Sequence, residues 1–257
     1  MIGIKTGRPK KQVPDEWRQI INKKFQKHRL NVLYLEKTIY YNYKIRIPHN
    51  TIHKVLLEQG FAKKDVKKQG RRKPWIRYER KHSLSAIHLD WHDSKYNNLK
   101  VCVAIADASR KILAGGEFES ATAENSILIV QEVINEYGYI RVVRETITDH
   151  GSQFTANQTD KKGNSNGLFE KFLRENGIKH IKCRIKHPQT NGEVEKWFDF
   201  YERFRPKQES FENLISWYNN RPHGSLNLRR AETPMLAFKR KLPIEYWFGL
   251  SNNFIKW

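Results

Sequence analysis

Two aspartates and one glutamate, far apart in the chain, are the residues whose types could support phosphodiester chemistry. Asp90 lies in a strand-like segment, residues 85–92, and Asp149 ends a β-rich run that continues into a glycine turn. Glu195 follows a polar loop and precedes apolar residues at helical spacing, which predicts that it lies in the first turn of a helix. Mg²⁺ prefers oxygen ligands, and two such ions about 3.5–4 Å apart can activate a nucleophile and stabilise a leaving group.

Each of these residues also has a simpler interpretation. A single aspartate is commonly a turn former or a helix cap, and a glutamate near a helix N-terminus is commonly a solvated surface residue. Two further aspartates, Asp93 and Asp107, each follow a strand-like segment, at residues 85–92 and 100–106, and are assigned to turns. Spacing along the chain does not by itself bring the three carboxylates together.

The order of three short motifs narrows the interpretation. They are Asp-Trp-His at residues 90–92, Asp-His-Gly-Ser-Gln-Phe at residues 149–154, and His-Pro-Gln-Thr-Asn-Gly-x-Val-Glu at residues 187–195. This set resembles the catalytic core of retroviral integrases and insertion-sequence transposases, the Asp-Asp-Glu recombinases with a ribonuclease H-like fold. The resemblance covers about residues 80–240, and a Tyr-Asn-x-Arg-Pro-His pattern at residues 218–223 is similar to the same family.

The resemblance implies a function and a set of catalytic residues. Asp90, Asp149 and Glu195 would bind two Mg²⁺ ions, for which Mn²⁺ would substitute, with Asp90 bridging the pair. Glu193, two positions away on the same helix, would point elsewhere. The protein would cleave the ends of a transposon and join the freed 3′-OH to target DNA, acting as a homodimer or larger assembly on terminal repeats and target.

Two other functions remain open. A ribonuclease H-like nuclease would share the three carboxylates without strand joining, and a transposase-derived DNA-binding protein would recognise DNA without catalysis. Two departures from the retroviral pattern also stand out: there is no N-terminal His/His/Cys/Cys zinc module, and a polar insertion at residues 155–167 lengthens the interval between Asp149 and Glu195.

The charge of the chain predicts a polyanionic partner. Its 48 Lys and Arg against 27 Asp and Glu give a net charge of +21, and residues 1–84 hold 23 of the basic and only 6 of the acidic residues. A strongly basic front before a nearly balanced remainder is typical of DNA binding followed by a catalytic domain. The sequence lacks an apolar run of membrane-spanning length and a hydrophobic signal region, so we expect no membrane partner and a cytoplasmic, nucleoid-associated location.

Residues 1–60 have the pattern of a helix-turn-helix DNA-binding domain with a basic leader. Helices are predicted after Pro14, over residues 31–41 and over residues 51–59, and the last is amphipathic. We expect its polar side to contact the major groove through Asn50, Thr51, His53 and Lys54. An ordinary three-helix packing unit is the alternative. Residues 61–82 form a basic linker that would follow the DNA backbone, with Arg71, Arg72 and Lys73 at its centre.

Residues 83–240 are predicted to form an α/β core, with a mixed sheet and helices on both faces, and residues 241–257 an aromatic C-terminal tail. Strands are expected at residues 86–91, 100–106, 112–119, 144–148 and 180–185, and helices at 123–137, 168–176, 194–204 and 211–220. Next to the catalytic helix we expect DNA contacts from Lys186, His187, Gln189, Asn191 and Lys196. Cys102 and Cys183 lack disulfide or zinc spacing, and Cys102 is assigned to the core.

Overall fold

The computed structural model describes residues 12–63, 79–156, 167–183 and 192–243. Its contacts divide the chain into two compact units. One comprises Met1–Pro74 with Pro222–Glu232 and is helical, and the other comprises Trp75–Arg221 with Thr233–Trp257 and contains the sheet. The two units are described separately.

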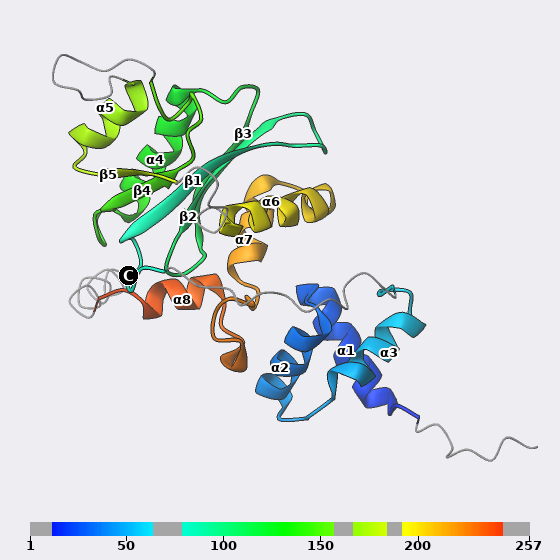
Figure 1. The fold of residues 1–257 in the computed structure, drawn as a ribbon. Coiled ribbons are helices and arrows are strands. Elements are labelled where there is room, and N and C mark those ends of the chain that lie inside the picture. Colours follow the sequence, from blue (N-terminus) through cyan, green and yellow to red (C-terminus); the bar gives the residue numbers. More distant parts are fainter. Residues whose placement is uncertain (1–11, 64–78, 157–166, 184–191, 244–257) are drawn as a thin grey trace, which may run out of the picture. The chain divides into compact units, whose positions relative to one another are not determined.

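Three helices build the helical unit: α1 (Asp15–His28), α2 (Val32–Tyr43) and α3 (His49–Glu58) (Figure 1). Asn31 caps α2, where its side chain accepts a hydrogen bond from the backbone N–H of Tyr34 at 3.1 Å. The apolar stripes of the three helices meet in one core, which includes Ile21, Leu35, Ile39, Ile47, Ile52 and Val55. The three helices predicted for this region are therefore present.

The segment Pro222–Glu232 groups with the helical unit and not with the sheet unit, to which its place in the sequence assigns it. It includes the short 3-10 helix η3 (Leu228–Arg230), which contacts α2. The segment is closed on itself, because the backbone N–H of His223 donates to the carbonyl of Glu232 at 3.0 Å. Contacts distant in sequence decide the grouping of this segment, and local pattern does not reveal them.

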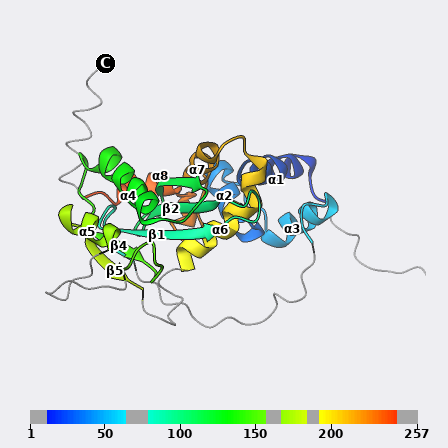
Figure 2. The ribbon, with the colours of Figure 1, turned by 90° about the horizontal axis from the view of Figure 1, so that it is seen from above.

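A five-stranded sheet forms the centre of the other unit (Figures 1 and 2). Its strands lie in the order β3-β2-β1-β4-β5. Neighbours β1 (Ala86–Asp93), β2 (Lys100–Ala106) and β3 (Ile112–Phe118) pair antiparallel as a meander. The shorter strands β4 (Glu145–Thr148) and β5 (Lys179–Lys182) add parallel to β1. This mixed pairing requires crossover connections, and helices supply them.

Helices cover both faces of the sheet (Figure 1). On one face, α4 (Ala123–Tyr137) and α5 (Leu168–Glu175) pack over Ile87, Leu89 and Cys102, and Phe238 of α8 (Pro234–Arg240) joins them. On the other face, α6 (Gly192–Phe204) and α7 (Phe211–Asn219) pack over Val101, Val103 and Ile105. Since successive strand residues point to opposite faces, the sheet is buried on both sides.

The structure confirms the α/β class and the predicted order of strands and helices up to α7. Three of the differences stand out. Strand β1 continues two residues beyond its predicted end and includes Asp93, so the turn assigned to Asp93 is wrong. Asp93 pairs with Lys100 of β2, and its Oδ1 lies 2.7 Å from Nζ of that lysine. Helix α8 was not predicted, although Thr233 and Pro234 are a helix-start signal, and Thr233 does cap Leu236. A short 3-10 helix, η2 (Arg205–Lys207), extends α6.

Both cysteines are buried and free, and the burial of Cys102 confirms its assignment to the core. Within the described ranges, no helix combines the length and apolar character needed to span a membrane.

Candidate active site

Asp90 lies in β1 on the face of the sheet that α6 covers. In the antiparallel register it pairs with Val103, whose side chain contacts the α6 cluster, while its neighbours Leu89 and Trp91 pack toward α4. The carboxylate is half-buried, and its Oδ1 accepts a hydrogen bond from the backbone N–H of Trp91 at 2.8 Å. This hydrogen bond orients the carboxylate.

Asp149 follows directly after β4 on the strand next to β1. In the parallel register His88 pairs with Ile147, so the same register continued by two residues sets Asp149 opposite Asp90. The two aspartates therefore lie beside each other on the same face of adjacent parallel strands, which run about 4.8 Å apart, with Asp90 within β1 and Asp149 just past the end of β4. Asp149 is also half-buried, and its Oδ1 accepts a hydrogen bond from the backbone N–H of Gly151 at 2.9 Å.

Cys183 directly follows β5 and lies beside Asp149, in line with the two aspartates. Its backbone N–H donates to the carbonyl of Thr148 at 2.8 Å, which extends the pairing of β5 with β4 by one residue. Burial raises the pKa of the Cys183 thiol to about 11, and the negative charges of Asp90 and Asp149 act in the same direction. The thiol therefore remains protonated at neutral pH.

Helix α6 carries Glu195 in its first turn. Val194, Trp197 and Tyr201 are buried against the sheet, whereas Glu195 is exposed. Phe198 and Glu202 follow Glu195 by three and seven positions, so all three residues occupy one flank of the helix. This flank faces β1.

His92 joins that flank to the strand of Asp90. Its Nε2–H donates to Oε1 of Glu202 at 2.8 Å, and its ring stacks on Phe198 with centroids 4.8 Å apart. Glu202 also accepts a hydrogen bond from the backbone N–H of Lys95 at 2.9 Å. His92 belongs to the Asp-Trp-His motif, but sequence alone assigned it no role, because its partners lie more than 100 residues away. We call His92, Phe198 and Glu202 the brace.

The structure brings together two of the three carboxylates expected to hold metal. Asp90 and Asp149 are neighbours with oxygen donors, which suits Mg²⁺. Among the described residues, no three His, Cys, Asp or Glu side chains lie close enough to hold a metal ion, so Glu195 is not gathered with the pair. It lies on the correct flank of α6, and a three-carboxylate site requires that it approach the aspartates.

The residues predicted to read DNA on α3 are accessible. Asn50 and Lys54 are exposed, and Thr51 and His53 are half-buried. The opposite side of the helix, Ile52, Val55 and Leu56, is buried, as the amphipathic pattern predicted. Contact between this exposed side and DNA stays a prediction.

The other predicted DNA contacts are distributed differently. Lys196 is exposed on α6, one position after Glu195. The remaining ones lie outside the described residues: Arg71, Arg72 and Lys73 of the basic linker, and Lys186, His187, Gln189 and Asn191 before α6.

Comparison with known proteins sets a relative and a structural neighbour beside this geometry. No protein-family model matches the chain. The chain is 25% identical over 142 residues to "Putative integrase ORF3" of Spiroplasma virus SpV1-C74, which covers 48% of this chain and only 38% of that protein. The catalytic core domain of BIV integrase is similar in structure, with a TM-score of 0.43 and 18% identity, over 66% of this chain and 98% of that domain.

Proposed function

We propose that this protein is a DNA transposase or integrase, a polynucleotidyl transferase that cleaves DNA ends and joins a 3′-OH to target DNA. The observation that carries the proposal is the pair of half-buried aspartates, Asp90 and Asp149, on adjacent parallel strands beneath the helix of Glu195. The similarity to a viral protein named as an integrase supports it. The ordered motifs of the sequence support it independently.

Each carboxylate has a distinct role in this proposal. Asp90 and Asp149 each have one oxygen held by a backbone N–H, so the carboxylates are oriented before any ligand arrives. Glu195 supplies the third carboxylate from α6. Mg²⁺, or Mn²⁺ in its place, would be held by these three residues and would supply a polarised nucleophile and neutralisation of phosphate charge.

DNA would be recognised by parts of the chain outside the carboxylate pair. The exposed side of α3 has the side chains of a major-groove reader, and the basic residues before the core would bind phosphates. Joining two DNA ends to one target suits a homodimer or larger assembly.

An in vitro strand-transfer assay tests the proposal. The substrate is a labelled duplex that carries the inverted repeats flanking the coding region, with a supercoiled plasmid as target and Mg²⁺ or Mn²⁺ as the metal. We expect joined product from the wild-type protein. Asp90→Asn and Asp149→Asn should each lower the rate at least about 100-fold while the duplex remains bound, because each removes a charged ligand needed only for chemistry.

Two outcomes would contradict the proposal. Cleavage of the RNA strand of a hybrid without any joined DNA would identify a ribonuclease H-like nuclease. Binding of the repeats with no metal-dependent product, together with identical behaviour of Asp90→Asn, would identify a DNA-binding protein without catalysis.

A further inference from the structure

Four aromatic rings from α6 and α7 form a cluster on the side of α6 away from Glu195. Phe200 and Phe204 of α6 have ring centroids 4.8 Å apart, and Trp217 of α7 lies 5.3 Å from the first and 5.0 Å from the second. Tyr218 packs on Phe200 at 5.1 Å. Phe204 is nine positions after Glu195, which is about 180° around the helix axis. The cluster therefore occupies a different surface from the carboxylates.

Three cations lie on these rings. The Arg221 guanidinium is 4.9 Å from the centroid of Phe200 and 5.3 Å from that of Trp217. Arg203 and Lys207 lie 5.8 and 5.7 Å from the centroid of Phe204. A cation over an aromatic ring is attracted to it without using its N–H donors.

Among the residues that the structure describes, these three cations have no acidic partner. Within the described residues, no carboxylate lies at ion-pair distance from Arg203, Lys207 or Arg221. The Nε of Arg221 is buried and has no hydrogen-bond partner in the described part of the chain. Burial lowers the pKa of Arg221 to about 10, and the positive charge of Arg203 acts in the same direction. A partly desolvated cation beside a second cation is costly unless an anion joins them.

We propose that Arg203, Lys207 and Arg221 form a second DNA-binding surface, which holds the phosphodiester backbone at the C-terminal end of α6, away from Glu195 in its first turn. The proposal rests on the proposed function, since it assumes that the chain acts on DNA. A phosphate accepts two parallel hydrogen bonds from a guanidinium whose face is already stacked, and the two exposed cations beside it suit neighbouring phosphates. Such contacts are independent of base sequence.

The salt dependence of DNA binding tests this surface in the full chain. A fluorescent duplex of arbitrary sequence is titrated in EDTA, so no metal-dependent chemistry contributes. The variant Arg203→Gln/Lys207→Gln removes two exposed side chains and leaves the aromatic cluster intact. Each phosphate contact contributes about a 3.5-fold loss of affinity when salt rises from about 50 to about 200 mM. Over that salt range, we expect the variant's loss of DNA affinity to be roughly tenfold smaller than that of the wild type.

A matched control is available on α5, which lies on the other face of the sheet. Lys171→Gln/Arg174→Gln also removes two exposed positive charges. We expect it to leave the salt dependence close to that of the wild type. Arg221→Gln should remove about one further contact, and its melting temperature reports whether its fold is retained.

The proposal is overturned if Arg203→Gln/Lys207→Gln has the salt dependence of the wild type, or if the α5 control lowers it equally. The first result would mean that something other than DNA covers these cations, and the second that only net charge matters. Neither result depends on strand transfer, so a failure of this surface is distinguishable from a failure of the proposed function.

Discussion

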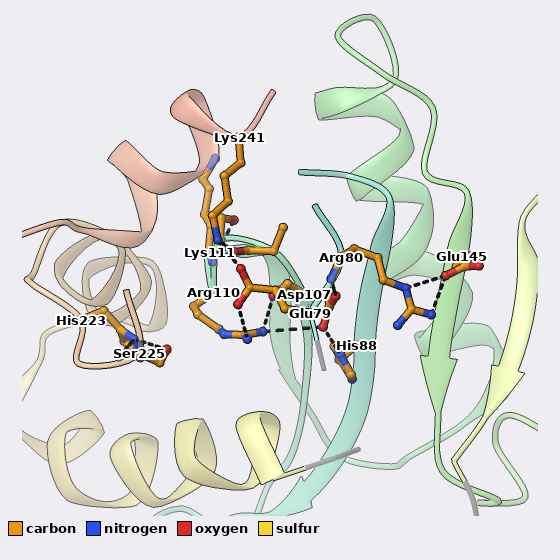
Figure 3. A network of polar contacts seen from close by, with 12 residues as sticks. Glu79, Arg80, His88, Asp107, Arg110, Lys111, Glu145, His223, Ser225 and Lys241 are labelled. Carbon is orange, nitrogen blue, oxygen red and sulfur yellow. Dashed lines mark hydrogen bonds and ion pairs between the residues drawn. The ribbon is translucent and has the colours of Figure 1, made fainter. Parts of the chain in front are cut away.

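Replacing Asp107 should destabilise the sheet unit far more than its apparent role as a turn residue suggests. Asp107 directly follows β2, but its side chain is only 3% exposed and lies in a network of charged groups (Figure 3). Its Oδ1 accepts a hydrogen bond from Nε2 of His88 at 3.0 Å, and its Oδ2 accepts one from the backbone N–H of Arg80 at 2.6 Å. The turn assignment from sequence is therefore incomplete.

The expected loss in free energy of unfolding follows from the charged groups that surround Asp107. Arg110 is 2% exposed and lies 3.7 Å from Oδ1 of Asp107, and it also pairs with Glu79 at 3.1 Å. Removing one member of a buried ion pair costs about 3–5 kcal/mol, because the other charge stays buried. We expect Asp107→Asn to lower the free energy of unfolding by about 3 kcal/mol, and Asp107→Ala by more, since it removes both acceptors.

Urea unfolding followed by tryptophan fluorescence measures this change, and Asp93→Asn provides a matched control. Asp93 is 78% exposed and paired with Lys100, so its substitution should cost roughly 0–1 kcal/mol. Equal losses for the two variants, or a loss below about 1 kcal/mol for Asp107→Asn, would refute the reasoning from burial.

The same variant changes the acid sensitivity of the protein. Burial raises the pKa of Asp107, but the hydrogen bond and charge of His88, the Arg80 N–H and the Arg110 charge outweigh it, so the pKa lies below its ordinary value. The carboxylate then contributes stability above the ordinary carboxyl pKa, which is lost as the pH falls below about 4. Asp107→Asn should remove that part of the pH dependence.

Three further predictions concern other side chains. Glu195→Gln should abolish strand transfer while Glu193→Gln retains it; the reverse result would reassign the third carboxylate. His92→Ala should lower the free energy of unfolding by about 1–3 kcal/mol, and a double-mutant cycle with Glu202→Gln should give a coupling of about 1 kcal/mol. Burial lowers the pKa of Lys111 to about 8, so stability should rise as the pH increases from about 8 to about 10.5, and Lys111→Met should lose this rise.

Much of the local structure was determined by the sequence itself. Apolar periodicity and turn residues predicted the order of strands and helices, because both depend on neighbours within a few positions. The same signals placed Asp90 in a strand, Asp149 at the end of another, and the buried side of α3 at Ile52, Val55 and Leu56. Helix α8 also has a local start signal in Thr233 and Pro234, although it was not predicted.

Contacts between distant residues were decided only by the tertiary structure. The parallel register of β1 with β4 sets Asp90 beside Asp149, and no pattern within either strand specifies it. The brace from His92 to Glu202 likewise joins residues whose proximity depends on how α6 packs on the sheet. Asp107 follows a strand in a turn, as predicted, but it is also buried and lies at the centre of a charged network. A side chain's type is local, but its dielectric environment and its partners are properties of the folded chain.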